Sequence, residues 1–191
     1  MANSIKPTAN TSLKVYNPDS LYVTPFVDGV RGTTTYKLNE VIRDTTTITQ
    51  EDPTENRVEN EFGSAPILNN VQLGSYTFSA EVADMQSELL EKLCGYIKGT
   101  TNTDRLHAPA TYTPIYAEIA LSFKVSDTKY VAAVLPKVQL NSKATFDSLS
   151  TSMGRITLAG TGLNLAVADG ADVEIETPFY IDTDFKPSSE L

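Results

Sequence analysis

Residues 115–140 read IYAEIALSFKVSDTKYVAAVLPKVQL. Apolar side chains fill the odd positions from Ile115 to Val125. After Ser126-Asp127-Thr128-Lys129 they move to even positions: Tyr130, Ala132, Val134, Val138 and Leu140. Alternation with a period of two is the pattern of a β-strand that buries one face. The stretch therefore predicts two long antiparallel strands joined by a polar turn.

Residues 74–98 predict a strand followed by a helix. In GSYTFSAEV (74–82) the residues Tyr76, Phe78, Ala80 and Val82 share one face. Asp84 is a predicted helix N-cap. Beyond it, apolar residues recur every three or four positions: Met85, Leu89, Leu90, Leu93, Cys94 and Ile97. This spacing predicts one amphipathic helix over about 85–98, which Gly99 ends.

Shorter strands are predicted on both sides of these elements. Their expected ranges are 21–27, 34–42, 67–71, 155–159, 163–167 and 171–181. Pro25 suggests an edge strand, Asp28-Gly29 a turn, and Gly160-Thr161-Gly162 a hairpin turn. Seven or eight strands with one flanking helix predict a mainly β protein, built as a two-sheet β-sandwich or barrel.

An acidic segment interrupts this pattern. Residues 40–61 hold seven acidic and two basic side chains, with Thr at 45, 46, 47 and 49. Thr and Ile favour extended backbone, but so polar a segment cannot bury a face alone. One interpretation is a flexible loop. The other, which we favour, is an extended arm over about 42–65, with its tip at Asp52-Pro53, that docks onto a neighbouring subunit by strand pairing.

Composition limits the remaining possibilities. The 191 residues fit one domain, with a polar leader over 1–18 and an acidic tail over 182–191. The sequence has no run of about 18 apolar residues, so we predict no membrane span. The leader does not look like a secretion signal. A net charge of −9 argues against a basic surface that wraps nucleic acid. The one cysteine cannot form an internal disulfide.

Catalytic and metal-binding groups are sparse in the sequence. His107, the only histidine, falls in a polar segment that reads as a surface loop. Cys94 lies on the apolar stripe of the predicted helix, where a thiol acts as a small hydrophobic group. Asp182 and Asp184 are two positions apart in an acidic tail, which is weak evidence for a cation site. We therefore expect no enzymatic activity, no cofactor and no metal.

A second acidic pattern lies near the C-terminal end. Asp172, Glu174 and Glu176 alternate with Val173 and Ile175, so a strand would carry the three carboxylates on one face, about 6.7 Å apart. A solvated outer face would tolerate this row of like charges. The sharper interpretation is the wall of a water-filled channel, where negative charge would repel phosphates.

The order of these elements resembles a known family. An acidic arm (IRDTTTITQEDPTENRVENEFGSAP, 42–66), a strand (GSYTFSAEVADM, 74–85) and one helix (QSELLEKLCGYI, 86–97) follow one another as in tail tube, or major tail, proteins of tailed bacteriophages. Tube proteins of contractile injection systems share that fold. The resemblance implies hexameric rings stacked into a hollow tube that conducts the genome, for either a contractile or a non-contractile tail.

The resemblance also implies roles for particular residues. The arm would join stacked rings, and Asp172, Glu174 and Glu176 would line the lumen. Expected partners are further copies of the chain, other tail proteins and double-stranded DNA passing without specific binding, with no membrane. The protein would reside in the virion tail and, during assembly, in the host cytoplasm. The alternatives are a head–tail joining or decoration protein and a carbohydrate-binding β-sandwich module. The candidate arm residues are Asp44, Thr46, Ile48, Gln50, Glu51, Asp52, Glu55, Arg57, Glu59 and Glu61.

Overall fold

The computed structural model describes residues 18–59, 66–83, 85–111, 113–146, 154–168 and 173–186, with the main chain alone for 56–59 and 66–70. Strands make up most of it, together with one helix in the described residues, α1 (Ser87–Cys94). The strands are β1 (Ser20–Val27), β2 (Val30–Arg31), β3 (Tyr36–Leu38), β4 (Thr47–Gln50), β5 (Thr54–Glu59), β6 (Pro66–Gln72), β7 (Tyr76–Val82), β8 (Ile97–Lys98), β9 (Leu106–His107), β10 (Ile115–Ser126), β11 (Lys129–Leu140), β12 (Lys143–Thr145), β13 (Arg155–Gly162), β14 (Leu165–Ala168), β15 (Glu174–Thr177) and β16 (Tyr180–Phe185).

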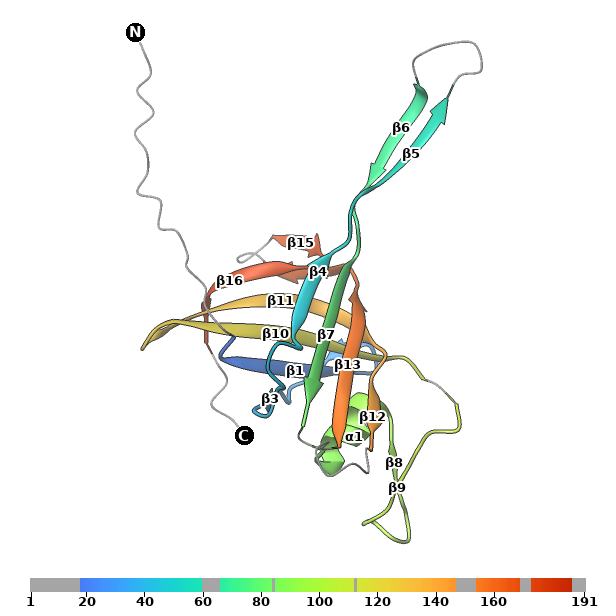
Figure 1. The fold of residues 1–191 in the computed structure, drawn as a ribbon, viewed down its shortest axis with the longest axis vertical. Coiled ribbons are helices and arrows are strands. Elements are labelled where there is room, and N and C mark those ends of the chain that lie inside the picture. Colours follow the sequence, from blue (N-terminus) through green and yellow to red (C-terminus); the bar gives the residue numbers. More distant parts are fainter. Residues whose placement is uncertain are drawn as a thin grey trace.

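The mainly β class is confirmed as one large, curved antiparallel sheet with smaller two-stranded pieces. Its order is β2-β1-β10-β11-β13-β7-β4, and β3, β12 and β16 pair on the flanks. β10 and β11 form the predicted hairpin at its centre. In Figure 1 the strands around β10 and β11 cross those around β7 and β13 at a steep angle, with α1 at one end. The arrangement is a barrel-like sandwich.

A β-bulge changes which side chains of β11 face the core. Ala117 pairs with Val138 and Ile119 pairs with Leu135, so Pro136 and Lys137 stand opposite Glu118 alone. The extra residue reverses the alternation. Leu135, Val138 and Leu140 belong to the main core, whereas Ala132 and Val134 belong to a second cluster. The predicted single face of even positions is therefore wrong beyond Val134.

Both faces of the central hairpin are covered. The main core lies between the two halves of the sheet and takes Leu89, Leu90 and Leu93 from α1. The second cluster holds Tyr22, Ala120, Ala132 and Val134, and β16 closes it with Tyr180 and Phe185. The rings of Tyr22 and Phe185 lie 5.5 Å apart. Of the acidic segment, Val41 and Ile48 also pack against the main core.

The Gly160-Thr161-Gly162 segment is not the hairpin turn that the sequence suggested. β13 runs through it and pairs with β7 on one side and with the end of β11 on the other. A Cβ atom on Gly160 would collide with the carbonyl oxygen of Gln139 and lie 2.5 Å from Cγ1 of Val138. Glycine is needed here because the strands approach closely where the sheet bends.

Other boundaries also differ from the sequence-based ranges. The strand expected over 171–181 is two strands, β15 and β16, separated at Pro178. The strand expected over 163–167 is β14, Leu165–Ala168. β1 is not an edge strand, since β10 lies on one side and β2 and β3 on the other. Pro25 lies between the segments that pair with β3 and β2, so its missing N–H breaks no ladder bond.

The β1–β2 turn follows the sequence prediction. Asp28 and Gly29 have φ values of 50° and 82°, the left-handed conformation that a tight hairpin turn requires.

The helix is shorter than predicted. Gly95, with a φ of 72°, ends it and donates its N–H to the carbonyl of Leu90, so Gly99 is not the terminator. The N-cap position is Gln86, without a side-chain capping bond, while Asp84 lies outside the described residues. Ile97 belongs to β8 and is 60% exposed instead of joining the apolar stripe. Tyr36 attaches β3 to the helix by donating its hydroxyl to Oε1 of Glu88 over 2.8 Å.

Candidate functional site

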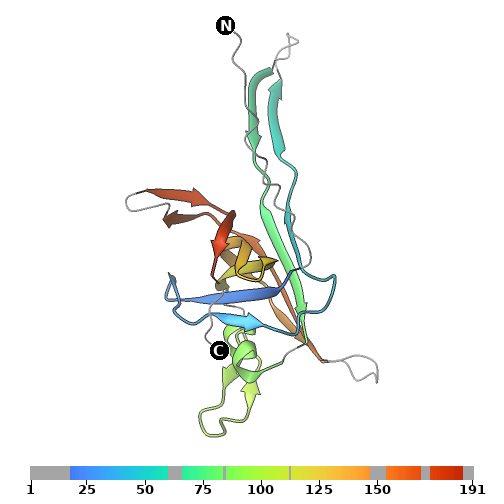
Figure 2. The ribbon, with the colours of Figure 1, turned by 90° about the vertical axis from the view of Figure 1, so that its left-hand side faces the viewer.

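The acidic segment forms a β-hairpin that extends beyond the body. β5 pairs antiparallel with β6 from Thr54 opposite Gln72 to Glu59 opposite Pro66. Figures 1 and 2 both show this hairpin projecting from the end of β4 and β7, away from the rest of the sheet. We call β5, β6 and their connection the arm. It is the most prominent candidate for contact with another molecule.

The arm begins later than the sequence suggested. β4 pairs with β7, with Ile48 opposite Phe78, so it belongs to the main sheet. The predicted arm residues Asp44, Thr46, Ile48 and Gln50 therefore lie in the body. Asp52 and Pro53 lie at the base of the arm and not at its tip, because the ladder resumes at Thr54. The strand expected over 67–71 is the returning strand of the arm, β6.

The base of the arm is closely fitted. The N–H of Glu51 donates to the carbonyl of Ser75 over 2.9 Å, and the hydroxyl of Ser75 donates to the carboxylate of Glu51. A Cβ atom on Gly74 would collide with the carbonyl oxygen of Glu51. Val71 and Leu73 are 58% and 76% exposed beside this junction. The base of the arm is thus held by the hydrogen bonds between Glu51 and Ser75, and it carries the exposed apolar side chains of Val71 and Leu73.

The predicted arm residues that remain on the projecting part are mostly solvent-facing. Glu51, Asp52 and Glu55 are exposed. Arg57 and Glu59 lie on β5, where only the main chain is described, and Glu61 lies outside the described residues. The carboxylates of Asp52 and Glu55 therefore face water, while that of Glu51 accepts the hydrogen bond from Ser75.

The second acidic pattern lies on a ribbon made of β14 and β15. Ala166 pairs with Glu176 and Ala168 with Glu174, and these four side chains are exposed on one face. Asp172 lies outside the described residues. Val173 and Ile175 alternate with the acids and are 55% and 48% exposed. The exposed carboxylate face fits both a solvated surface and a channel wall.

The groups considered for chemistry are dispersed. Cys94 is half-buried at the end of α1, and burial raises the pKa of its thiol to about 11. His107 is exposed in β9, a short strand paired with β8, and not in a loop as expected. Within the described ranges, no three His, Cys, Asp or Glu side chains are grouped to hold a metal ion. The described helix is too short to cross a membrane.

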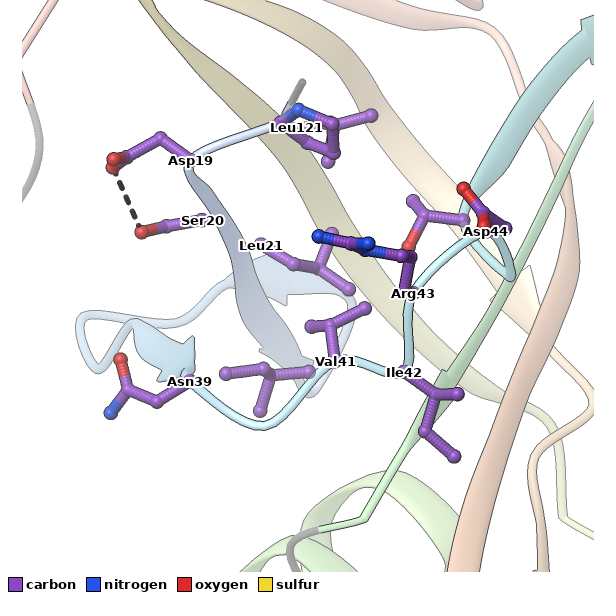
Figure 3. A pocket seen from close by; sticks show the side chains of 12 residues that line it. Asp19, Ser20, Leu21, Asn39, Val41, Ile42, Arg43, Asp44 and Leu121 are labelled. Atoms are coloured by element: carbon purple, nitrogen blue, oxygen red, sulfur yellow. Dashed lines mark hydrogen bonds between the residues drawn. The ribbon is translucent and has the colours of Figure 1, made fainter.

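A surface groove was not indicated by any sequence pattern. It lies between the start of β1 and the connection from β3 to β4, and its volume is about 540 Å³. Figure 3 shows Asp19, Ser20 and Leu21 on one side and Val41, Arg43 and Asp44 on the other. Its lining comes from segments distant in the chain, which is why local periodicity could not reveal it.

No protein-family model and no curated protein matches this chain. Among solved structures, a chain in the cryo-electron microscopy structure of the anti-feeding prophage baseplate is similar over 84% of this chain and 91% of its own length. The TM-score is 0.40 and the sequence identity 8%.

Proposed function

We propose that this protein is a structural subunit of a phage-type tail that assembles with its own copies into stacked rings. The rings are hexameric and form a tube through which the genome leaves the virion. The observation that carries the proposal is the arm, an acidic hairpin that projects from a body with its own complete core. The arm of one ring reaches the next ring and sets the stacking.

The physical state of the arm supports a role in assembly. An isolated two-stranded hairpin is only marginally stable in water, because it lacks a third strand or a packed face. The arm nevertheless keeps an extended ladder of pairs from Thr54 to Gln72. A neighbouring subunit would supply the missing contacts by strand pairing and by covering Val71 and Leu73. Without such contacts, the length of the ladder would not make the arm stable.

The charge distribution supports a conduit. Glu174 and Glu176 present carboxylates from one exposed face of a ribbon. Repeated around a ring, such a face makes a negative wall along which double-stranded DNA passes without binding. In this proposal the protein catalyses no reaction, and its partners are its own copies and other tail proteins.

The test is to view purified protein by negative-stain electron microscopy, with light scattering to measure mass. We expect rings or tubes from the full chain. A variant in which a Gly-Ser linker replaces residues 54–72 should fold, as judged by circular dichroism, and form no tubes. The matched control shortens residues 100–105, another exposed connection. Tubes of normal length from the armless variant, or a full chain that stays monomeric at high concentration, would overturn the proposal.

A further inference from the structure

β4 forms an open edge of the main sheet. It pairs with β7 on one side, and no strand in the described ranges pairs with its other side. Proteins usually protect such edges with lysine, proline or bulges. Residues 45–50 read TTTITQ, without charge or proline, and Thr47, Thr49 and Gln50 are exposed. The edge is therefore free to accept a further strand.

The main chain of β4 directs hydrogen-bonding groups to this edge. The N–H of Glu51 donates to the carbonyl of Ser75 over 2.9 Å, and the register with β7 continues from there along β4 without a shift. Successive residues of an antiparallel ladder turn their N–H and C=O groups to opposite sides. The groups of Thr49 therefore face β7, whereas those of Ile48 and Gln50 face outward. Among the described residues, none bonds to these outward groups.

The returning strand of the arm, β6, has a matching open edge. It pairs with β5 on one side and with no other described strand. Its sequence, PILNNVQ, contains no charged residue, whereas β5 carries Glu55, Arg57 and Glu59. Pro66 is the first residue of β6, a position where strands tolerate proline. Of the two strands of the arm, β6 is thus the one whose neutral sequence matches the neutral edge of β4.

The direction of the strands also selects β6. The chain leaves the body through β4 and β5 and returns through β6 and β7, so β6 runs opposite to β4. The arm points toward one end of the longest axis of the molecule (Figures 1 and 2). Copies stacked with the same end up keep their strand directions, so β6 of one copy meets β4 of the next in antiparallel orientation. β5 would meet it in parallel orientation, which is the less stable kind of pair.

The other open edges of the main sheet fit less well. β16 carries Asp182 and Asp184, and the N–H of Asp184 already donates to Oδ1 of Asp182 over 2.9 Å. β3 and β12 have three residues each and carry Lys37 and Lys143. β2 has two residues and carries Arg31. Charged side chains on short strands are the usual protection of an edge. Within the described strands, β4 is the edge without it.

We propose that β6 of one copy adds to the β4 edge of a copy in the next ring, an inference that rests on the proposed stacking. The two copies then share a sheet in the order β7-β4-β6-β5, with β7 and β4 from the acceptor and β6 and β5 from the donor. β6 has seven residues and β4 has four, so β6 covers the whole edge. The outward main-chain groups of Ile48 and Gln50 gain partners, and the arm becomes part of a wider sheet.

Two one-sided variants test this pairing without requiring tubes. The acceptor has a Gly-Ser linker in place of residues 54–72, and the donor keeps the arm but carries T47K/T49K on its own β4. We expect their mixture to form a complex in sedimentation velocity that neither variant forms alone. Adding T47K/T49K to the acceptor, or Q50P, which removes one outward N–H, should weaken the complex at least tenfold. The matched control T101K/T103K adds the same charges to an exposed connection of the acceptor and should bind as before.

Hydrogen exchange of individual amides then identifies the edge. In an isotope-labelled acceptor we expect the amides of Ile48 and Gln50 to gain protection when the donor binds, because they point outward. The amide of Thr49 already faces β7 and should change little. In a labelled donor, alternate amides of β6 should gain protection. Contact through side chains alone would not produce this alternation.

Several outcomes would overturn the inference. These are no complex between folded donor and acceptor, equal binding by the T47K/T49K acceptor, a donor that pairs arm to arm with itself, or unchanged exchange at Ile48 and Gln50. Tubes from the full chain without donor–acceptor binding would refute this pairing alone. A donor–acceptor complex without tubes from the full chain would refute the proposed tube and leave the pairing in place.

Discussion

At the residue scale, Tyr36 connects β3 to the helix. Its ionisation makes the stability of the fold fall with rising pH in the alkaline range. Its ring is buried, and burial, followed by the hydrogen bond to Glu88, raises the pKa of its phenol from 10.0 to about 12. The folded protein therefore holds the proton to higher pH than the unfolded chain does. The resulting stabilisation is complete below pH 10 and is lost as the pH rises to about 12.

Substitution of this tyrosine should reveal the effect. We expect Y36F to lower the free energy of unfolding by about 0.5–1.5 kcal/mol at pH 8, through loss of the hydrogen bond. The difference between Y36F and the original chain should shrink between pH 10 and 12, because the tyrosine is then ionising. Urea unfolding of both proteins at pH 8 and between pH 10 and 12 measures this difference. A difference that stays constant with pH would show that Tyr36 does not titrate as described.

Two glycines of β13 provide a matched comparison of close packing. A Cβ atom on Gly160 would collide with the main chain of β11, whereas one on Gly162 would meet its nearest atom, Cδ2 of Leu135, at 3.3 Å. We expect G160A to destabilise the fold by about 1–3 kcal/mol and G162A by clearly less. Thermal unfolding of both variants measures the difference. Equal effects would mean that β11 moves to accept the methyl group.

At the scale of elements, the arm should be the least protected part of the ladder. β5 and β6 pair with each other, while β10 and β11 are flanked and buried on both faces. Local opening of a bare hairpin costs little free energy. In the unassembled protein we expect amides of 54–59 and 67–72 to exchange with deuterium at least a hundredfold faster than those of 131–135. Assembly should slow the arm and leave the hairpin unchanged.

Two exchange results would contradict the proposed role of the arm. If exchange in the arm is as slow in the unassembled protein as in the central hairpin, the arm is stable alone and needs no partner. If exchange in the arm stays fast in assembled tubes, the arm makes no ring-to-ring contact.

Periodicity predicted the elements whose burial is regular, and failed where tertiary contacts intervene. The hairpin of β10 and β11, β7 and the helix core were predictable because each buries one face at a fixed repeat. The bulge at Pro136 and the continuous strand through Gly160 depend on what the neighbouring strand does. The local sequence shows the glycine, but it does not show that β11 packs closely against it.

The same limit applies to the candidate surfaces. The acidic composition of 40–61 indicated an arm, but its start depends on where β7 stops pairing with β4, between Tyr76 opposite Gln50 and Thr54 opposite Gln72. The groove combines β1, β10 and the β3–β4 connection, which are far apart in sequence. Only the folded chain brings Asp19 and Asp44 to one rim.

At the scale of the whole molecule, the net negative charge of each copy conflicts with the close contact between copies that a tube requires. The chain carries −9, which opposes close approach of copies, and yet the proposed tube requires many copies in contact. Some of the acids lie on projecting pieces, such as Glu55 on the arm and Glu174 and Glu176 on the β14–β15 ribbon, away from the central sheet. Contacts between bodies can then form through uncharged edges such as β4.

The lumen assignment can be tested on assembled tubes. We expect E174K/E176K to assemble, because both side chains are exposed and outside the two cores. The four-unit charge reversal in each subunit should then hold double-stranded DNA at low salt, since repeated lysines neutralise phosphates. Sedimentation of tubes with labelled DNA measures retention, and raising the salt should release it. A variant with the same reversal at D104K/D127K, in two exposed turns outside the arm and the ribbon, controls for charge alone. Equal retention by both variants, or none by E174K/E176K tubes, would place Glu174 and Glu176 away from the path of the DNA.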